Sequence, residues 1–104
     1  MTLRPRHAGG WSNIDHHCQL CTMNKRTDWY IETRDWVIAE KINGGPFAVY
    51  KTHTDQLTGN EWDSMERVVD LVFDQYDITV MMNIVKDHFH AHILTDCDPK
   101  LERY

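Results

Sequence analysis

The 104-residue sequence lacks several features that mark broad classes of protein. No apolar run approaches the roughly 20 residues that a membrane-spanning helix needs. The first residues, Met1 to Arg6, lack the apolar core of a secretory signal. The sequence contains no internal repeat and no low-complexity tract, and it is too short for a second domain. We therefore expect one domain in a cytoplasmic protein without a membrane partner.

Basic residues are also few. The sequence has 11 Lys and Arg against 16 Asp and Glu, which gives a formal net charge of −5. A duplex nucleic-acid binder neutralises phosphates with a basic surface, so nucleic acid is disfavoured as a partner. A small local anion site is compatible with this charge.

Cysteine is scarce: the sequence has three, and an odd number of cysteines cannot all form disulfides within the chain. Cys18 and Cys21 form a Cys-x-x-Cys pair. In a reducing cytosol such a pair is more often a metal clip or a redox site than a disulfide. Cys97 stands in an acidic, turn-like segment, and we interpret it as incidental.

The remaining residues suggest strands, one long helix and then two more strands. Residues 1–13 have no apolar periodicity and predict a loose arm, followed by a single domain over residues 14–104. Thr58 and Glu61 form a capping box, and apolar residues recur at helical spacing as far as Tyr76. Strands are predicted over residues 29–32, 36–40, 47–51, 78–84 and 88–94. This order favours an α+β domain, an antiparallel sheet with a helix on one face.

Three histidines alternate with apolar residues in the last predicted strand. Successive strand side chains point to opposite faces, so His88, His90 and His92 share one face while the residues between them face the core. Core packing alone does not call for three adjacent titratable rings. The pattern therefore predicts a chemical role for this face.

A metal site is the first candidate role. Cys18 and Cys21 supply two ligands of a tetrahedral zinc site, and two more must come from elsewhere. His53, after the third strand, and His88 are the candidates. Two rival ligands precede the cysteines, His16 and His17.

Phosphorus chemistry is the second candidate role. A neutral His90 can attack an electrophilic phosphorus, and a protonated His92 can hydrogen-bond a phosphate oxygen or protonate a leaving group. The alternative is a redox metal held by all three histidines, with Asp87 or Asp96 as the carboxylate nearby in sequence.

Four landmarks of this chain, in this order, resemble the histidine triad (HIT) superfamily of nucleotide hydrolases and transferases. They are Cys18 to Met23, Val49 to His53, an amphipathic helix, and His88 to Leu94. The resemblance implies about five antiparallel strands with one long and one short helix, usually paired as a homodimer. It also implies a bound Zn²⁺ with the ligands Cys18, Cys21, His53 and His88.

The resemblance assigns further roles to individual residues. His90 matches the histidine that attacks the α-phosphorus of a nucleotide, giving a nucleotidyl-histidine intermediate that water or another acceptor resolves. His92 matches the histidine that contacts the phosphate. Leu20 and Met23 match apolar positions near the base-binding cleft, with ordinary core packing as the alternative.

The chain departs from the family pattern before the first motif histidine. The family has a glycine-rich phosphate-binding loop there, whereas this chain passes from Asn83 to His88 through four residues without glycine. Asn83 and Lys86 are the remaining candidates for phosphate contact, although Asp87 opposes Lys86 by its charge. Two functions follow: a nucleotide hydrolase or nucleotidyltransferase, or a noncatalytic zinc-stabilised binding protein on the same scaffold.

Overall fold

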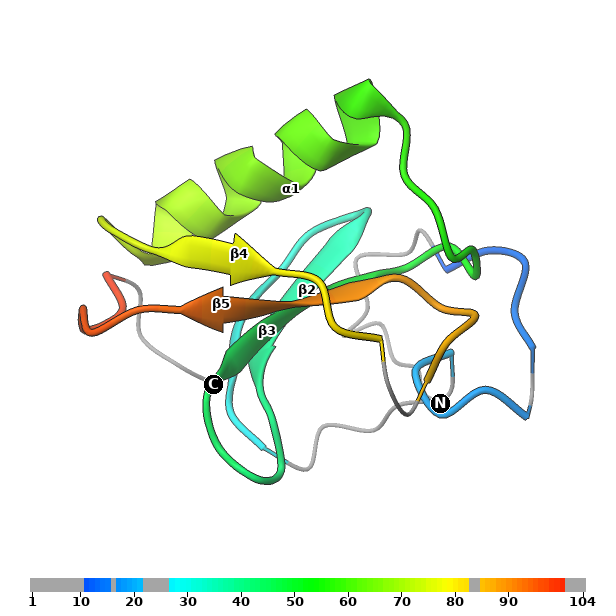
Figure 1. Ribbon diagram of the computed structural model, residues 1–104, viewed down its shortest axis with the longest axis horizontal. Helices are drawn as coiled ribbons and strands as arrows, with labels where there is room; N and C mark the ends of the chain where they lie inside the picture. The colour runs from blue at the N-terminus through cyan, green and yellow to red at the C-terminus, as the bar shows by residue number, and fades with distance from the viewer. Residues whose placement is uncertain (1–10, 16, 22–26, 83–84, 101–104) are drawn as a thin grey trace, which may run out of the picture.

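The computed structural model describes residues 11–15, 17–21, 27–82 and 85–100. Its elements are β1 (Trp29–Glu32), β2 (Trp36–Glu40), β3 (Pro46–Tyr50), α1 (Gly59–Val72), β4 (Asp77–Thr79) and β5 (His90–Leu94). The strands form one antiparallel sheet in the order β1-β2-β3-β5-β4, and α1 lies across one face of it (Figure 1). The expected α+β class and five-stranded antiparallel sheet are confirmed. Over the described ranges α1 is the only helix, so the expected short helix has no counterpart there.

The face of the sheet toward α1 carries the larger core. Met65, Val69 and Val72 of the helix are buried against apolar side chains of the sheet, among them Ile38 and Ala91. Thr58 caps the helix through the predicted capping box with Glu61. A helix so capped and so patterned is stabilised mainly by burial of its apolar face.

The helix ends earlier than its apolar spacing predicts. Phe73 has an extended backbone and terminates α1, whereas the prediction extended to Tyr76. Phe73 is buried and Tyr76 half-buried in the same core. The apolar spacing continues past Val72 because these side chains reach the core from a non-helical backbone.

Two predicted strands are also shorter in the structure. β4 covers Asp77–Thr79 rather than residues 78–84, because it pairs only with the last three residues of β5. β5 begins at His90 rather than His88, because the N–H of Phe89 donates to the carbonyl of Thr54 in a loop. His88 therefore precedes the strand.

The second face of the sheet carries a smaller core formed with the N-terminal segment. Cys18, Leu20 and Cys21 are buried there against strand residues that include Trp29 and Val49. None of the described segments forms a helix with the length and apolar character needed to cross a membrane. The expected division into an arm and a domain is left as a prediction.

Candidate metal centre

Antiparallel pairing brings two of the candidate ligands to the same end of the sheet. β3 and β5 run in opposite directions, so the end of β3 lies beside the start of β5. His53 follows the first and His88 precedes the second. The N–H of Phe89 donates to the Thr54 carbonyl at 2.6 Å and joins these two segments.

The N-terminal segment brings the cysteines to the same place. The N–H of His53 donates to the Ser12 carbonyl at 2.9 Å, and the N–H of Cys18 donates to the Asp15 carbonyl at 3.0 Å. Figure 1 shows residues 11–15 and 17–21, the chain after β3 and the chain before β5 gathered at one end of the sheet. Three segments far apart in sequence thus meet.

The four residues predicted as metal ligands form one cluster. Their ligand atoms all lie within 4.8 Å of one another, and the group could hold a metal ion. Cys21 Sγ is 3.1 Å from His53 Nδ1 and 3.3 Å from His88 Nδ1. Cys18 Sγ is 3.5 Å from His88 Nδ1, and the two Nδ1 atoms are 3.3 Å apart. Both histidines thus direct Nδ1 at the cluster.

The opposite nitrogen of each ring has its own partner. His88 Nε2 donates to the Tyr50 carbonyl at 2.5 Å, and His53 Nε2 lies 3.5 Å from Asp87 Oδ2. The carboxylate of Asp15 also lies within 4.8 Å of the His53 ring. Such partners fix the tautomer and orientation of a metal-binding histidine.

Burial shifts the pKa values of two members of the cluster, His88 and Cys21. It lowers the pKa of His88, so this ring is neutral and offers a lone pair. Burial also raises the pKa of the Cys21 thiol, although the N–H of Asp15, 3.4 Å from Sγ, works in the opposite direction. A metal ion binds the thiolate, so binding at neutral pH releases a proton from such a thiol.

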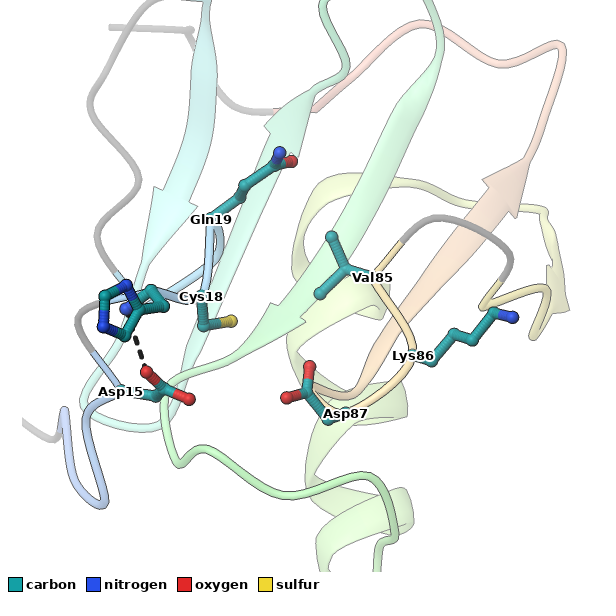
Figure 2. Close-up of a pocket in the computed structure, with 7 residues that line it drawn as sticks. Asp15, Cys18, Gln19, Val85, Lys86 and Asp87 are labelled. Carbon is teal, nitrogen blue, oxygen red and sulfur yellow. Dashed lines mark hydrogen bonds between the residues drawn. The ribbon is translucent and has the colours of Figure 1, made fainter.

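An open pocket of about 230 Å³ lies beside the cluster. In Figure 2, Cys18 and Asp87 face each other across it, with Asp15 and Gln19 on the side of Cys18. Lys86 lies on the rim but points away from the other labelled residues. Of the four residues of the cluster, Cys18 alone lines this pocket.

The other candidate residues are spread over several places. His17 lines the pocket and is exposed, outside the four-residue cluster. Leu20 is buried in the second core, which fits the packing alternative. His16, Met23 and Asn83 fall outside the described residues.

His90 and His92 form a separate group on the second face of the sheet. Their ring centroids are 6.2 Å apart. His90 Nδ1 lies 3.0 Å from the His88 carbonyl, and His92 Nδ1 lies 2.6 Å from Lys41 Nζ. Among the described residues, neither belongs to a candidate metal cluster, which disfavours three histidines around one redox metal.

Two features of these sites were not predicted from the sequence. The contact of Asp87 with His53 was one, since the sequence suggested Asp87 only as a carboxylate near a redox metal and as a charge opposing Lys86. The contact of Lys41 with His92 was the other. The only sequence signal for Lys41 was its position just after a strand and before a Gly-Gly turn.

Comparison with known proteins adds no relative: no family model, curated protein or solved structure matches this chain.

Proposed function

We propose that the cluster of Cys18, Cys21, His53 and His88 holds a zinc ion. A tetrahedral zinc with Zn–S of ~2.3 Å and Zn–N of ~2.05 Å separates its ligands by ~3.3 Å for two nitrogens and ~3.6 Å for sulfur and nitrogen. The separations here, 3.3 Å between nitrogens and 3.1 to 3.5 Å between sulfur and nitrogen, fit that geometry. Two thiolates and two imidazoles are also a donor set that zinc prefers.

The proposed zinc is structural. Four protein ligands complete a tetrahedral shell and leave no position for a substrate. When bound, the ion supplies a cross-link between the N-terminal segment, the chain after β3 and the chain before β5.

Elemental analysis of the purified protein tests this site. We expect about one zinc per chain, lost in Cys18→Ser with a large fall in melting temperature. Full zinc retention in both Cys18→Ser and His53→Ala would refute the ligand set. Iron, copper or manganese in place of zinc would favour a redox centre.

For the protein as a whole, we propose a HIT-like hydrolase or nucleotidyltransferase in which His90 is the nucleophile. The observation that carries this proposal is the 3.0 Å contact of His90 Nδ1 with the His88 carbonyl. A carbonyl only accepts hydrogen bonds, so the proton is on Nδ1 and the lone pair is on Nε2. The order of the four landmarks and the five-stranded sheet support the same family.

In the proposed reaction, the Nε2 lone pair of His90 forms a bond to the α-phosphorus of a nucleotide. The bond from phosphorus to the leaving group breaks, and the leaving group takes its electron pair and a proton from solvent. Water or another acceptor then attacks phosphorus, loses its proton and returns the electron pair to Nε2. The Nδ1–H donated to His88 stabilises the positive charge on the ring in the intermediate.

Mass spectrometry after incubation with adenosine phosphoramidate and dinucleoside polyphosphates tests the reaction. We expect a nucleotidyl adduct that maps to His90 and is lost in His90→Ala, while the fold of that variant stays intact. Wild-type inactivity and no adduct across the nucleotide panel would refute it. The proposed homodimer is tested separately by light scattering of the zinc-loaded protein.

A second candidate, a noncatalytic zinc-stabilised binding protein, is favoured by two observations. His90 is buried, with 9% of the residue exposed, and the Lys86 side chain points away from the other labelled residues of the pocket. Nucleotide binding without turnover, or no binding beside a full zinc site, would support this candidate.

A further inference from the structure

Lys41 lies at the end of the sheet opposite the metal cluster. It follows β2 directly, and its N–H donates to the Gly45 carbonyl at 2.8 Å, closing the turn between β2 and β3. Its Nζ lies 2.6 Å from His92 Nδ1. This contact joins a cation to the pair of histidines that the metal cluster does not use.

Strand register explains how Lys41 reaches His92. Ala39 pairs with Phe47, and Phe47 pairs with His92, so these three side chains point to one face of the sheet. Lys41 lies two residues beyond Ala39, which directs it to the same face. The Lys41 side chain passes beside Gly45, where a Cβ would lie 3.5 Å from Lys41 Cε, an ordinary van der Waals distance.

The Lys41 ammonium has no carboxylate neighbour in the described part of the chain: no ion pair within 4.0 Å is found for it there. An ammonium has three donors, and the His92 contact uses one of them. Two donors and a whole positive charge remain beside His92, whose ring is 6.2 Å from that of His90.

His92 itself is held in its neutral form. Burial lowers the pKa of His92, and the charge of Lys41 lowers it further, although a hydrogen bond with the backbone of Met81 works in the opposite direction. The sequence pattern had predicted a protonated His92 at the phosphate. A neutral ring that accepts from Lys41 at Nδ1 cannot supply that charge, whereas Lys41 can.

We propose that Lys41 binds a phosphate oxygen of the nucleotide whose α-phosphorus His90 attacks, and that His92 positions Lys41. This inference rests on the proposed nucleotidyl-transfer function and names the residue that takes over from the absent glycine-rich loop. Lys41 acts by charge and hydrogen bonding and undergoes no covalent change.

Calorimetric titration of the zinc-loaded protein with AMP, inorganic phosphate and adenosine tests the assignment. The variants are Lys41→Met, Lys41→Arg, Lys86→Met and, as a matched control, Lys100→Met, whose lysine pairs with Asp74 at 3.2 Å. Lys41→Met keeps an unbranched side chain of similar length without the charge. Zinc content and melting temperature check that each variant is folded.

We expect Lys41→Met to weaken AMP and phosphate binding about tenfold or more, since hydrogen bonds to charged groups are among the strong ones. Adenosine binding, which involves no phosphate, stays the same. Lys41→Arg restores most of the affinity, and Lys100→Met binds as the wild type does.

Three results would overturn the assignment: wild-type AMP affinity in Lys41→Met, no AMP binding by the wild type, or a larger loss in Lys86→Met than in Lys41→Met. Measuring the nucleotidyl adduct on His90 distinguishes failure of the Lys41 assignment from failure of the proposed reaction. If AMP binds through Lys41 but no His90 adduct forms, the reaction fails and the phosphate site stands. If the adduct forms while Lys41→Met keeps wild-type affinity, the reaction stands and the assignment fails.

Discussion

Replacing Asp87 with Asn should weaken zinc binding without removing a ligand. His53 has two nitrogens, with Nδ1 facing the cluster and Nε2 lying 3.5 Å from Asp87 Oδ2. The carboxylate favours the tautomer with its proton on Nε2, which leaves the Nδ1 lone pair for the metal, and it makes the ring more basic. Asn keeps the shape of Asp and removes the charge.

The structure indicates that the loss of zinc affinity in Asp87→Asn lies at the lower end of the range usual for such partners. Loss of such a partner typically costs about 10- to 100-fold in metal affinity. The Asp87 side chain is 67% exposed and its 3.5 Å contact is longer than a good hydrogen bond, so solvent and salt screen it. Asp15 also lies near His53 and retains part of the effect. We expect about a tenfold loss, or ~1.4 kcal/mol.

Competition with a chromophoric zinc chelator measures the affinity of the wild type and of Asp87→Asn. The matched control is Asp55→Asn, which changes an exposed carboxylate in the same loop as His53. The loss in Asp87→Asn should shrink at high salt, because the contact is partly exposed. Zinc affinity within twofold of wild type, or an equal loss in Asp55→Asn, would refute the role given to Asp87.

Three further predictions concern other parts of the fold. Burial and Lys41 hold the folded-state pKa of His92 below its ordinary value, so its contribution to stability is lost as pH falls from about 6.5 through that pKa. NMR titration should therefore find a higher His92 pKa in Lys41→Met, and an unchanged pKa would contradict the contact. Thr58→Ala removes the helix cap and should cost about 1 kcal/mol in urea unfolding, with no loss indicating that the cap is not formed in solution. Lys51 is fully buried and 2.7 Å from Glu32, so Lys51→Ala should cost about 3–5 kcal/mol by leaving a buried carboxylate without its cation; a cost below about 1 kcal/mol would argue against the buried pair.

The sequence predicted the elements that follow from periodicity and local capping. β1 and β2 have the predicted bounds, and α1 begins at the predicted cap, because alternation, helical spacing and the Thr58–Glu61 box are local properties of the chain. The end of α1 was predicted too late, because Phe73 and Tyr76 reach the core without being helical. Periodicity reports which side chains are buried, and not always which backbone carries them.

The four residues of the candidate metal site could be predicted from the sequence, but the hydrogen-bond and charge partners of those residues could not. The Cys18 and Cys21 spacing, with His53 and His88 near strand ends, indicated a four-residue group that lies together in the structure. The partners of those ligands depend on how a loop and a hairpin turn are placed in space. No spacing in the sequence links Asp87 to His53, which are 34 positions apart, so these contacts became visible only in the structure.

The distribution of the four proposed metal ligands along the chain has a consequence for the order of folding. Cys18 and His88 are 70 positions apart, and β1, β2, β3, α1 and β4 all lie between them. Closing so long a loop before the intervening elements form would cost chain entropy with few contacts in return. The complete four-ligand site is therefore expected to form late in folding, after the strands of the sheet have paired. The Cys18 and Cys21 pair, which is local in sequence, can bind metal before the sheet forms. Zinc should consequently slow unfolding more than it speeds folding.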